Sequence, residues 1–366
     1  MSERKLCYKV LIDEITPIPE SDNLELARIT GWRCVVQKGE FKVGDTALYF
    51  EIDSALNPHD DRFAFLKERC YKKFLDASKN LFDECIRIRT IKLRGQLSQG
   101  LLIPVKDFCE VRNKKIGESC ADVLCVRHYD EVAERAVRET TPFIAPNQKG
   151  LFPAWAGPKT DEERVQNLTD QDLDEHWDDE LEVTEKIDGT SMTVAYSAVN
   201  RPDDPVAVCS RNFELKDMPS AYWDMVHELN LDVKLKEWCE THGTEITIQG
   251  ELNGQGIQNN RDCKPGRSFD VFRIWNITEG RWIPPSERYV IVKELGLNHV
   301  PVLETRRISS FDDGSRDFVK VRDAILSYAE GKTANGNERE GIVLKELNGN
   351  GFSFKAVSNA YLLKLK

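Results

Sequence analysis

Short apolar runs alternate with turn residues in the first part of the chain. The runs cover Val10–Ile15, Leu24–Ile29, Cys34–Val36 and Ala47–Ile52, and prolines or glycines lie between them. Several short strands at such spacing are typical of a small β-barrel or β-sandwich. We therefore expect the N-terminal part to be an all-β domain.

A second pattern in this part combines apolar and basic positions. Ile86-Arg87-Ile88-Arg89 alternates between the two, and Lys92-Leu93-Arg94 alternates in the opposite phase. This change of phase predicts a bulge or a bend near Thr90. A strand with cations on one face suits an oligonucleotide-binding (OB) barrel, which follows phosphates. A solvated edge strand protected by charge has the same pattern, so both interpretations stay open.

The C-terminal part mixes helical and strand patterns. Helices are predicted over Lys216–His242, Pro285–Leu295 and Arg316–Glu330, and a glycine follows each directly, as is common at helix ends. Apolar strand-like runs lie between them. The expected fold class is therefore α+β, an N-terminal OB-type β-barrel followed by a mixed α/β domain.

Length and charge divide the chain further. A chain of 366 residues corresponds to about two domains. The net charge of −11 is concentrated in residues 126–185, which hold 16 acidic and 6 basic residues. We predict an OB domain over 1–125, an acidic linker or helix over 126–158, and a second domain over 159–366.

Other features concern the compartment of the protein. The sequence has no apolar run long enough to span a membrane and no secretory signal at Met1–Glu14. Its ten cysteines form no Cys-x-x-Cys pair, which favours reduced thiols over a disulfide framework or a zinc ribbon. A cytoplasmic protein is expected, with the nucleus as the alternative.

The segment Leu181–Tyr196 carries the most informative short motif. An apolar strand runs into Lys186-Ile187-Asp188-Gly189, and a second strand follows. A lysine at a strand end beside a glycine turn can reach a phosphate, and its amine becomes a nucleophile when it loses its proton. A surface hairpin with an Asp-Gly turn has the same four letters.

Further segments follow this motif in a fixed order. They resemble motifs Ia, III, IIIa, IV and V of the covalent nucleotidyltransferases, and they lie at 208–215, 248–254, 268–272, 340–345 and 352–356. With the lysine motif, the chain from about Lys159 onward resembles the ATP-dependent polynucleotide ligases. The N-terminal segments 15–25 and 38–45 resemble the OB module of the fifth RNA ligase family, the Deinococcus-like type. The second domain is then a nucleotidyltransferase domain, described as ATP-grasp-like.

The resemblance implies roles for residues that meet the nucleotide. Lys186 is the nucleophile that forms lysyl-AMP, and Lys345 and Lys355 hold the α-phosphate. Many relatives have Lys-x-Lys in motif V, where this chain has Lys355-Ala356-Val357, so the division of labour between the two lysines is open. The remaining ATP-binding candidates are Glu185 and Phe269 at the adenine (with Phe272 as alternative), Arg164 at the β- and γ-phosphates, Glu251 at the ribose, and Arg211 at a phosphate of the nucleotide or of the acceptor strand.

The resemblance also implies metal ligands and substrates. Glu340, Glu251 and Asp188 are the candidates for holding Mg²⁺ or Mn²⁺. The expected reaction adenylylates a 5′-phosphate with ATP and joins it to a 3′-OH RNA end, at nicks in duplexes. RNA or an RNA-containing nicked duplex is the expected partner, with no membrane and no obligate protein partner. Two alternatives are an OB-containing nucleic-acid-binding protein with an impaired nucleotidyltransferase domain, and a nucleotidyltransferase with another acceptor.

Overall fold

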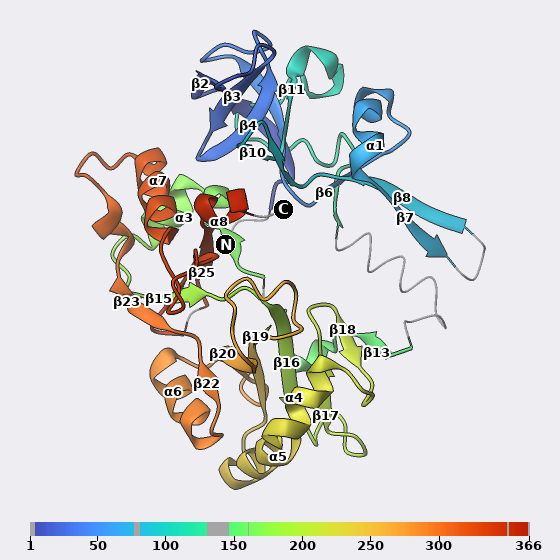
Figure 1. Ribbon diagram of the computed structural model, residues 1–366, viewed down its shortest axis with the longest axis vertical. Coiled ribbons are helices and arrows are strands. Elements are labelled where there is room, and N and C mark those ends of the chain that lie inside the picture. Colours follow the sequence, from blue (N-terminus) through green and yellow to red (C-terminus); the bar gives the residue numbers. More distant parts are fainter. Residues whose placement is uncertain (1–3, 77–80, 130–145, 160, 350, 365–366) are drawn as a thin grey trace. The chain divides into compact units, whose positions relative to one another are not determined.

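The computed structural model describes residues 4–76, 81–129, 146–159, 161–349 and 351–364. Figure 1 shows its elements along the chain. The chain divides into two compact units, residues 2–143 and residues 144–364. Residues 130–145, which belong to the predicted acidic linker, lie outside the described residues. Within the described ranges, no helix has both the length and the apolar character that crossing a membrane requires.

Short antiparallel strands build the N-terminal unit, as the apolar runs predict. The sheet orders are β1-β5-β11, β2-β3-β4, β9-β10 and β12-β6-β8-β7. The strands are β1 (Cys7–Leu11), β2 (Glu14–Pro17), β3 (Leu24–Ile29), β4 (Trp32–Gln37), β5 (Thr46–Phe50), β6 (Ser54–Leu56), β7 (Tyr71–Asp76), β8 (Leu81–Arg87), β9 (Thr90–Leu93), β10 (Gln96–Gln99), β11 (Leu101–Pro104) and β12 (Arg127–His128). Short helical segments are η1 (Asp61–Leu66), α1 (Lys67–Cys70), η2 (Val105–Asp107) and η3 (Cys109–Val111).

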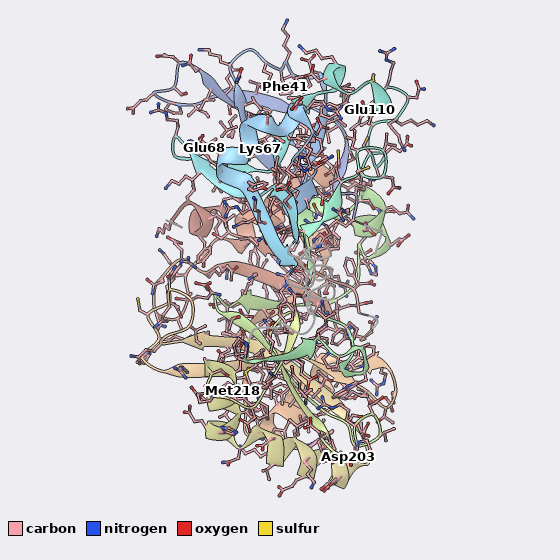
Figure 2. The ribbon with its side chains drawn as sticks, turned by 90° about the vertical axis from the view of Figure 1, so that its right-hand side faces the viewer. Phe41, Lys67, Glu68, Glu110, Asp203 and Met218 are labelled. Carbon is pink, nitrogen blue, oxygen red and sulfur yellow. The ribbon has the colours of Figure 1, made fainter. Side chains whose placement is uncertain are left out.

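Strand β5 lies between two hydrophobic clusters of this unit. Leu48 and Phe50 belong to one cluster, and Ala47 and Tyr49 belong to the other. Burial on both faces explains why this strand reads as a continuous apolar run rather than as an alternation. Phe41, labelled in Figure 2, is buried in the second cluster.

The phase change near Thr90 is a break between two sheets. β8 ends at Arg87 and pairs with β6 and β7, whereas β9 begins at Thr90 and pairs with β10. Arg87 lies 2.7 Å from a carboxylate oxygen of Asp53 and packs over the ring of Tyr129. Its charge is therefore neutralised within the unit.

Two sheets form the frame of the C-terminal unit. The eight-stranded sheet has the order β13-β18-β17-β16-β19-β20-β21 with β22 beside β20, and the five-stranded sheet has the order β14-β25-β24-β15-β23. The strands are β13 (Gln148–Leu151), β14 (Glu163–Arg164), β15 (Leu181–Lys186), β16 (Thr190–Tyr196), β17 (Val206–Cys209), β18 (Phe213–Leu215), β19 (Ile246–Gly254), β20 (Arg267–Asn276), β21 (Arg281–Trp282), β22 (Asn298–His299), β23 (Val302–Arg306), β24 (Gly341–Glu346) and β25 (Ser353–Val357).

Each sheet has its own hydrophobic core with helices. α4 (Ala221–Leu229), α5 (Leu231–His242) and α6 (Pro285–Glu294) pack on the eight-stranded sheet, and α3 (Asp170–Glu175) and α7 (Phe318–Ala329) pack on the five-stranded sheet. The remaining helical elements are η4 (Ala154–Ala156), η5 (Val165–Asn167), η6 (Ile308–Phe311) and α8 (Asn359–Lys364).

The predicted helices of this unit are confirmed with one difference. α6 and α7 lie within the predicted ranges, but the long helix predicted over Lys216–His242 begins at Ala221 and divides into α4 and α5. Asn230 separates them because its backbone is left-handed, with φ of 48°. Asparagine accepts this conformation more readily than most residues.

Candidate active site

The motif lysine lies where the chain crosses from one sheet to the other. Lys186 ends β15 in the five-stranded sheet, and β16 in the eight-stranded sheet begins at Thr190. β15 pairs with β23 and β24, and β16 pairs with β17 and β19, so these strands do not form an Asp-Gly hairpin. A Cβ on Gly189 would lie 2.4 Å from the carbonyl oxygen of Leu252, so the crossing requires glycine.

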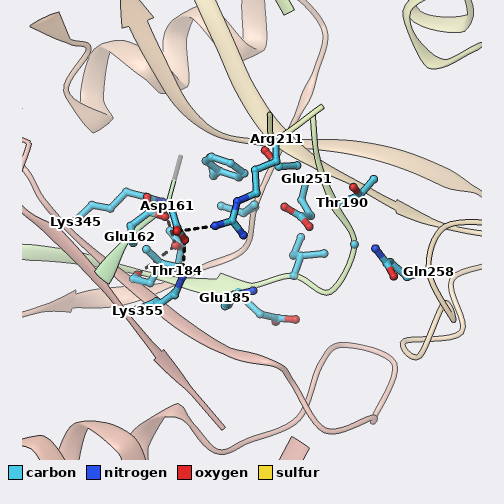
Figure 3. Close-up of a pocket in the computed structure, with 17 residues that line it drawn as sticks. Asp161, Glu162, Thr184, Glu185, Thr190, Arg211, Glu251, Gln258, Lys345 and Lys355 are labelled. Carbon is cyan, nitrogen blue, oxygen red and sulfur yellow. Dashed lines mark hydrogen bonds and ion pairs between the residues drawn. The ribbon is translucent and has the colours of Figure 1, made fainter. Parts of the chain in front are cut away.

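A cavity of about 340 Å³, the first cavity, opens beside this crossing (Figure 3). Both sheets contribute to its wall. Its charged, polar and aromatic residues are Asp161, Glu162, Thr184, Glu185, Lys186, Thr190, Ser191, Arg211, Glu251, Gln258, Phe272, Lys345 and Lys355. The cavity therefore brings together six of the predicted site residues, namely Glu185, Lys186, Arg211, Glu251, Lys345 and Lys355.

Strand pairing places Lys186 beside a carboxylate. Lys186 is in register with Gly341 of β24, and Glu340 directly precedes that strand. The Lys186 Nζ lies 2.6 Å from the Glu340 Oε1. Burial by itself lowers the pKa of Lys186, but the carboxylates of Glu340 and Glu251 outweigh it, so the pKa is raised. In this state the amine is protonated at neutral pH.

Three carboxylates form a group around Lys186. Glu251 comes from β19, Asp188 from the crossing segment and Glu340 from the start of β24. The pKa of Glu251 is raised to about 8, mainly by burial and also by Glu340 and Asp188, against the opposing effect of Lys186. Lys186 pairs with Glu340, and Arg261 pairs with Asp188. A divalent cation prefers carboxylate oxygens as ligands, so these three residues, which we call the carboxylate group, are the candidates for holding Mg²⁺ or Mn²⁺.

Cations gather at another part of the wall, where they meet Asp161. The Lys355 Nζ lies 2.8 Å from one carboxylate oxygen of Asp161, and the Arg211 Nη2 lies 2.7 Å from the other (Figure 3). A phosphate carries two or more oxygens at comparable separation, so it can replace this carboxylate between the same two cations.

Lys345 lies deeper, on β24. Its side chain is buried, with the Nζ 3.5 Å from the Thr184 Oγ1 and 5.6 Å from the centre of the Phe272 ring. Burial lowers the pKa of Lys345 to about 7, with help from the cations Arg288 and Arg273. We call Arg211, Lys345 and Lys355 the cation group.

The structure places Phe269 in the hydrophobic core and Phe272 in the cavity wall. Phe269 is 2% exposed, and it packs among the apolar residues under α4 to α6. A bulge in β20 changes the phase, because Gln249 pairs with Arg273 whereas the next residue, Gly250, pairs with Val271. Phe272 thus lies in the bulge and reaches the first cavity. The prediction for Phe269 is corrected in favour of the alternative.

Arg164 is adjacent to the cavity without being part of its wall. It lies in β14, in register with Lys355 of β25, and its positive charge lowers the pKa of Lys186. Asp188 and Glu340 also lie outside the first cavity and contribute to a neighbouring one, which is described below.

Sequence reasoning missed Asp161, Glu162 and Arg273. Glu162 lies 3.4 Å from Arg273, and although burial alone raises the pKa of Glu162, Arg273 and the two lysines of the cation group lower it. The available signal for Arg273 was a charged residue within the apolar run Val271–Trp275. Glu162 carries no such local signal.

Comparisons with known proteins agree with this geometry. An RNA ligase family model matches residues 179–357, and an OB-fold domain model matches residues 9–105. No curated protein matches significantly. A Naegleria gruberi RNA ligase variant solved as the apo form is 34% identical, with a TM-score of 0.74 over 100% of this chain and 99% of that chain.

Two further structures of that RNA ligase are similar to this chain. A variant with ATP and Mn has a TM-score of 0.74 and a structure with PPi has a TM-score of 0.71, each 34% identical over 99% of both chains. The predicted OB domain and RNA ligase domain are thereby confirmed. The chain belongs to the family of ATP-dependent RNA ligases.

Proposed function

We propose that Lys186 is the nucleophile of this ligase. Its amine attacks the α-phosphorus of ATP, forms a lysyl-AMP phosphoramidate and releases pyrophosphate. AMP then passes to the 5′-phosphate of an RNA strand, and a 3′-OH attacks that phosphate and expels AMP. The observation that carries the proposal is the position of the amine, in a wall that also holds an aromatic ring and the cation group.

The first cavity suits a nucleotide in its apolar and its charged parts. Phe272 and Val343 offer apolar surface for the adenine ring, and Thr184 and Glu185 lie beside them at the strand end. Lys345, Lys355 and Arg211 supply fixed positive charge for the phosphates. This charge stabilises the transition state more than the ground state, because negative charge develops on the transferred group. Arg164 lies near enough to act on the outer phosphates.

Activation of Lys186 requires the loss of its proton. The Glu340 and Glu251 carboxylates hold that proton in the present arrangement. The carboxylate group would hold Mg²⁺ or Mn²⁺, whose positive charge would neutralise these carboxylates and the ATP phosphates. Without the carboxylate charge, burial and the nearby Arg164 favour the neutral amine, which is the form that attacks.

The proposed substrate is a nicked duplex in which the 3′-OH end is RNA. The N-terminal unit matches an OB-fold domain, a fold that binds single strands and duplex ends through cations and aromatic rings. Lys92 and Arg94 are exposed on its β9–β10 hairpin and add positive charge to its surface. We propose no obligate protein partner.

Labelling with α-³²P-ATP or α-³²P-GTP in the presence of magnesium tests the proposal. A labelled protein band from ATP, absent in Lys186→Ala and discharged by a nicked duplex with an RNA 3′-OH, is the expected result. Labelling from GTP would show a different nucleotidyltransferase. No labelling by protein that mass measurement shows to be free of AMP would leave a nucleic-acid-binding protein with an impaired domain.

A further inference from the structure

A second cavity, of about 390 Å³, adjoins the first cavity in the C-terminal unit. The two share only Glu185, Lys186 and Ile187, so the end of β15 stands between them. The wall of the second cavity otherwise comes from Asp188, from the β19–β20 loop, from the segment before β24, and from Pro301 and Tyr361. Lys186 is therefore accessible from the second cavity as well as from the first cavity, the proposed nucleotide site.

The β19–β20 loop that lines this cavity is held by two consecutive residues in its middle. Arg261 donates to the Asp188 Oδ2 at 3.0 Å and to the Tyr361 hydroxyl at 2.9 Å. On its other side, Asp262 accepts from the Asn335 side chain at 3.0 Å and from the Thr333 hydroxyl. The loop therefore ties the crossing segment to the segment before β24.

The same loop holds strained backbone. Gln258, Asn260 and Cys263 have φ values of 46°, 41° and 54°, in the left-handed region that residues other than glycine rarely adopt. Each such residue costs free energy, and conformations of this kind cluster at ligand sites, where the surrounding contacts maintain them. Asn260 is itself bonded within the loop, because its side chain donates to the Lys264 carbonyl at 2.9 Å and accepts from the Lys264 backbone N–H at 3.0 Å.

The side chains of the second cavity suit a nucleotide end rather than a base pocket. Three cations line the cavity, and each pairs with a carboxylate, namely Arg261 with Asp188, Lys264 with Asp270 and Arg267 with Asp224. A phosphodiester can replace such a carboxylate beside a cation. Asp262 and Asn335 offer a carboxylate and an amide, the groups that bind ribose hydroxyls. The 2′-OH is the feature that distinguishes RNA from DNA at a given position.

The chemistry of the sealing step calls for a subsite in this place. The 3′-oxygen forms a bond to the phosphorus of the adenylylated 5′-phosphate, the bond from that phosphorus to the AMP oxygen breaks, and the hydroxyl proton leaves to solvent. Attacking and leaving oxygens lie roughly in line on opposite sides of the phosphorus. Because AMP fills the first cavity, the 3′-OH must approach from outside it.

We propose that the second cavity is the subsite for the 3′-terminal nucleotide of the acceptor RNA strand. Arg261 and Lys264 bind its phosphate, and Asp262 and Asn335 bind its ribose hydroxyls, with the 2′-OH among them. Asp188 and Glu340, at the border with Lys186, lie next to the 3′-OH. This inference rests on the proposed sealing function and adds the site at which the acceptor is bound.

Two measurements on each variant separate this inference from the proposed function. One is lysyl-AMP formation from labelled ATP, and the other is sealing of a preadenylylated 5′-RNA end to acceptors ending in ribose or in 2′-deoxyribose. The variants are Lys264→Ala and Asn335→Ala, and the matched control is Lys236→Ala, which removes an exposed lysine on α5 that pairs with Glu240.

For Lys264→Ala, we expect sealing to slow about tenfold at subsaturating acceptor, as the loss of one phosphate contact implies, while lysyl-AMP formation stays within about twofold of wild type. For Asn335→Ala, we expect the preference for a ribose end over a deoxyribose end to narrow about tenfold. Unchanged sealing and unchanged preference, or equal losses in both measurements, would overturn the inference. Failure of wild type to form lysyl-AMP would instead overturn the proposed function.

Discussion

The carboxylate group and the cation group differ in charge and in place. The cation group and Glu251 line the first cavity, whereas Asp188 and Glu340 line the neighbouring one. At the carboxylate group, Lys186 pairs with Glu340 and Arg261 pairs with Asp188, and the pKa of Glu251 is raised to about 8. At the cation group, Asp161 lies between Lys355 and Arg211, and the pKa of the buried Lys345 falls to about 7. The first group is suited to a divalent cation and the second to phosphate, so the wall is preorganised for both parts of a metal–nucleotide complex.

The difference also concerns what each group does to a proton. Acidic neighbours raise the pKa of Lys186, which in the proposed mechanism must lose its proton, whereas burial and other cations lower the pKa of Lys345. Ligand binding therefore shifts the pKa values of the two lysines in opposite directions. A metal ion favours the neutral form of Lys186, and a phosphate favours the charged form of Lys345.

Removing a member of the carboxylate group has the largest expected effect. Glu340→Ala and Glu251→Ala lower the rate of lysyl-AMP formation about 1000-fold, because each removes an oxygen ligand of the divalent metal that the adenylylation step requires. Single-turnover labelling measures this, and chelation of the divalent metal by EDTA gives a similar loss in wild type. A loss below about tenfold in both variants would contradict a metal role for these residues.

Loss of a lysine from the cation group has the next largest expected effect on adenylylation. Lys355→Met and Lys345→Met each lower the adenylylation rate about 100-fold, in the range found when one preorganised donor at a developing charge is removed. Because Lys345 is buried, methionine keeps most of its packing, and thermal unfolding serves as the control. Comparison of the two variants decides which lysine compensates for the altered motif V.

Substitution of Phe272 should affect ATP binding, whereas substitution of Phe269 should affect the stability of the fold. Phe272→Ala raises the KM for ATP about 30-fold, since stacking on a base contributes about 1–3 kcal/mol, and its effect on stability is small. Phe269→Ala lowers the free energy of unfolding by about 3–5 kcal/mol because it empties a core position. An equal rise in the KM for ATP in both variants, measured at a temperature at which both are folded, would contradict the placement of Phe272 at the adenine.

The pH dependence of the adenylylation rate tests how the carboxylate group controls the proton on Lys186. Because the pKa of Lys186 is raised, the neutral amine is the minor form at neutral pH, and the adenylylation rate rises with pH by up to about tenfold per unit below that pKa. Glu340→Gln removes a charge that holds the proton, so the rise shifts to lower pH. An unchanged profile in this variant would show that Glu340 does not control the Lys186 proton.

The smallest expected effect is at Asp161. Asp161→Asn removes a carboxylate that pairs with Lys355 and Arg211, so ATP no longer displaces it, and the KM for ATP falls about twofold to threefold. The effect is small because partly exposed ion pairs contribute little. Nucleotide binding is measured by titration calorimetry, and a rise in KM would show that Asp161 orients the cations instead.

Local patterns predicted most of the elements and the place of Lys186 at the end of a strand. α6 and α7 follow from their apolar spacing and from the glycines after them, and the short strands of the N-terminal unit follow from apolar runs between turns. Lys186 follows from its place between two strand patterns and from the order of the later motifs. These features depend on residues that are close together in the sequence, which is why the sequence is sufficient to predict them.

The element types, the order of the motifs and the family resemblance follow from the sequence alone. The fold decided that Phe272 rather than Phe269 reaches the cavity, because a single bulge reverses the faces of β20. It also decided the pairing of Lys186 with Glu340, the approach of Arg273 to Glu162 and the second cavity. Each depends on strand register and on contacts between distant segments, which no local pattern encodes.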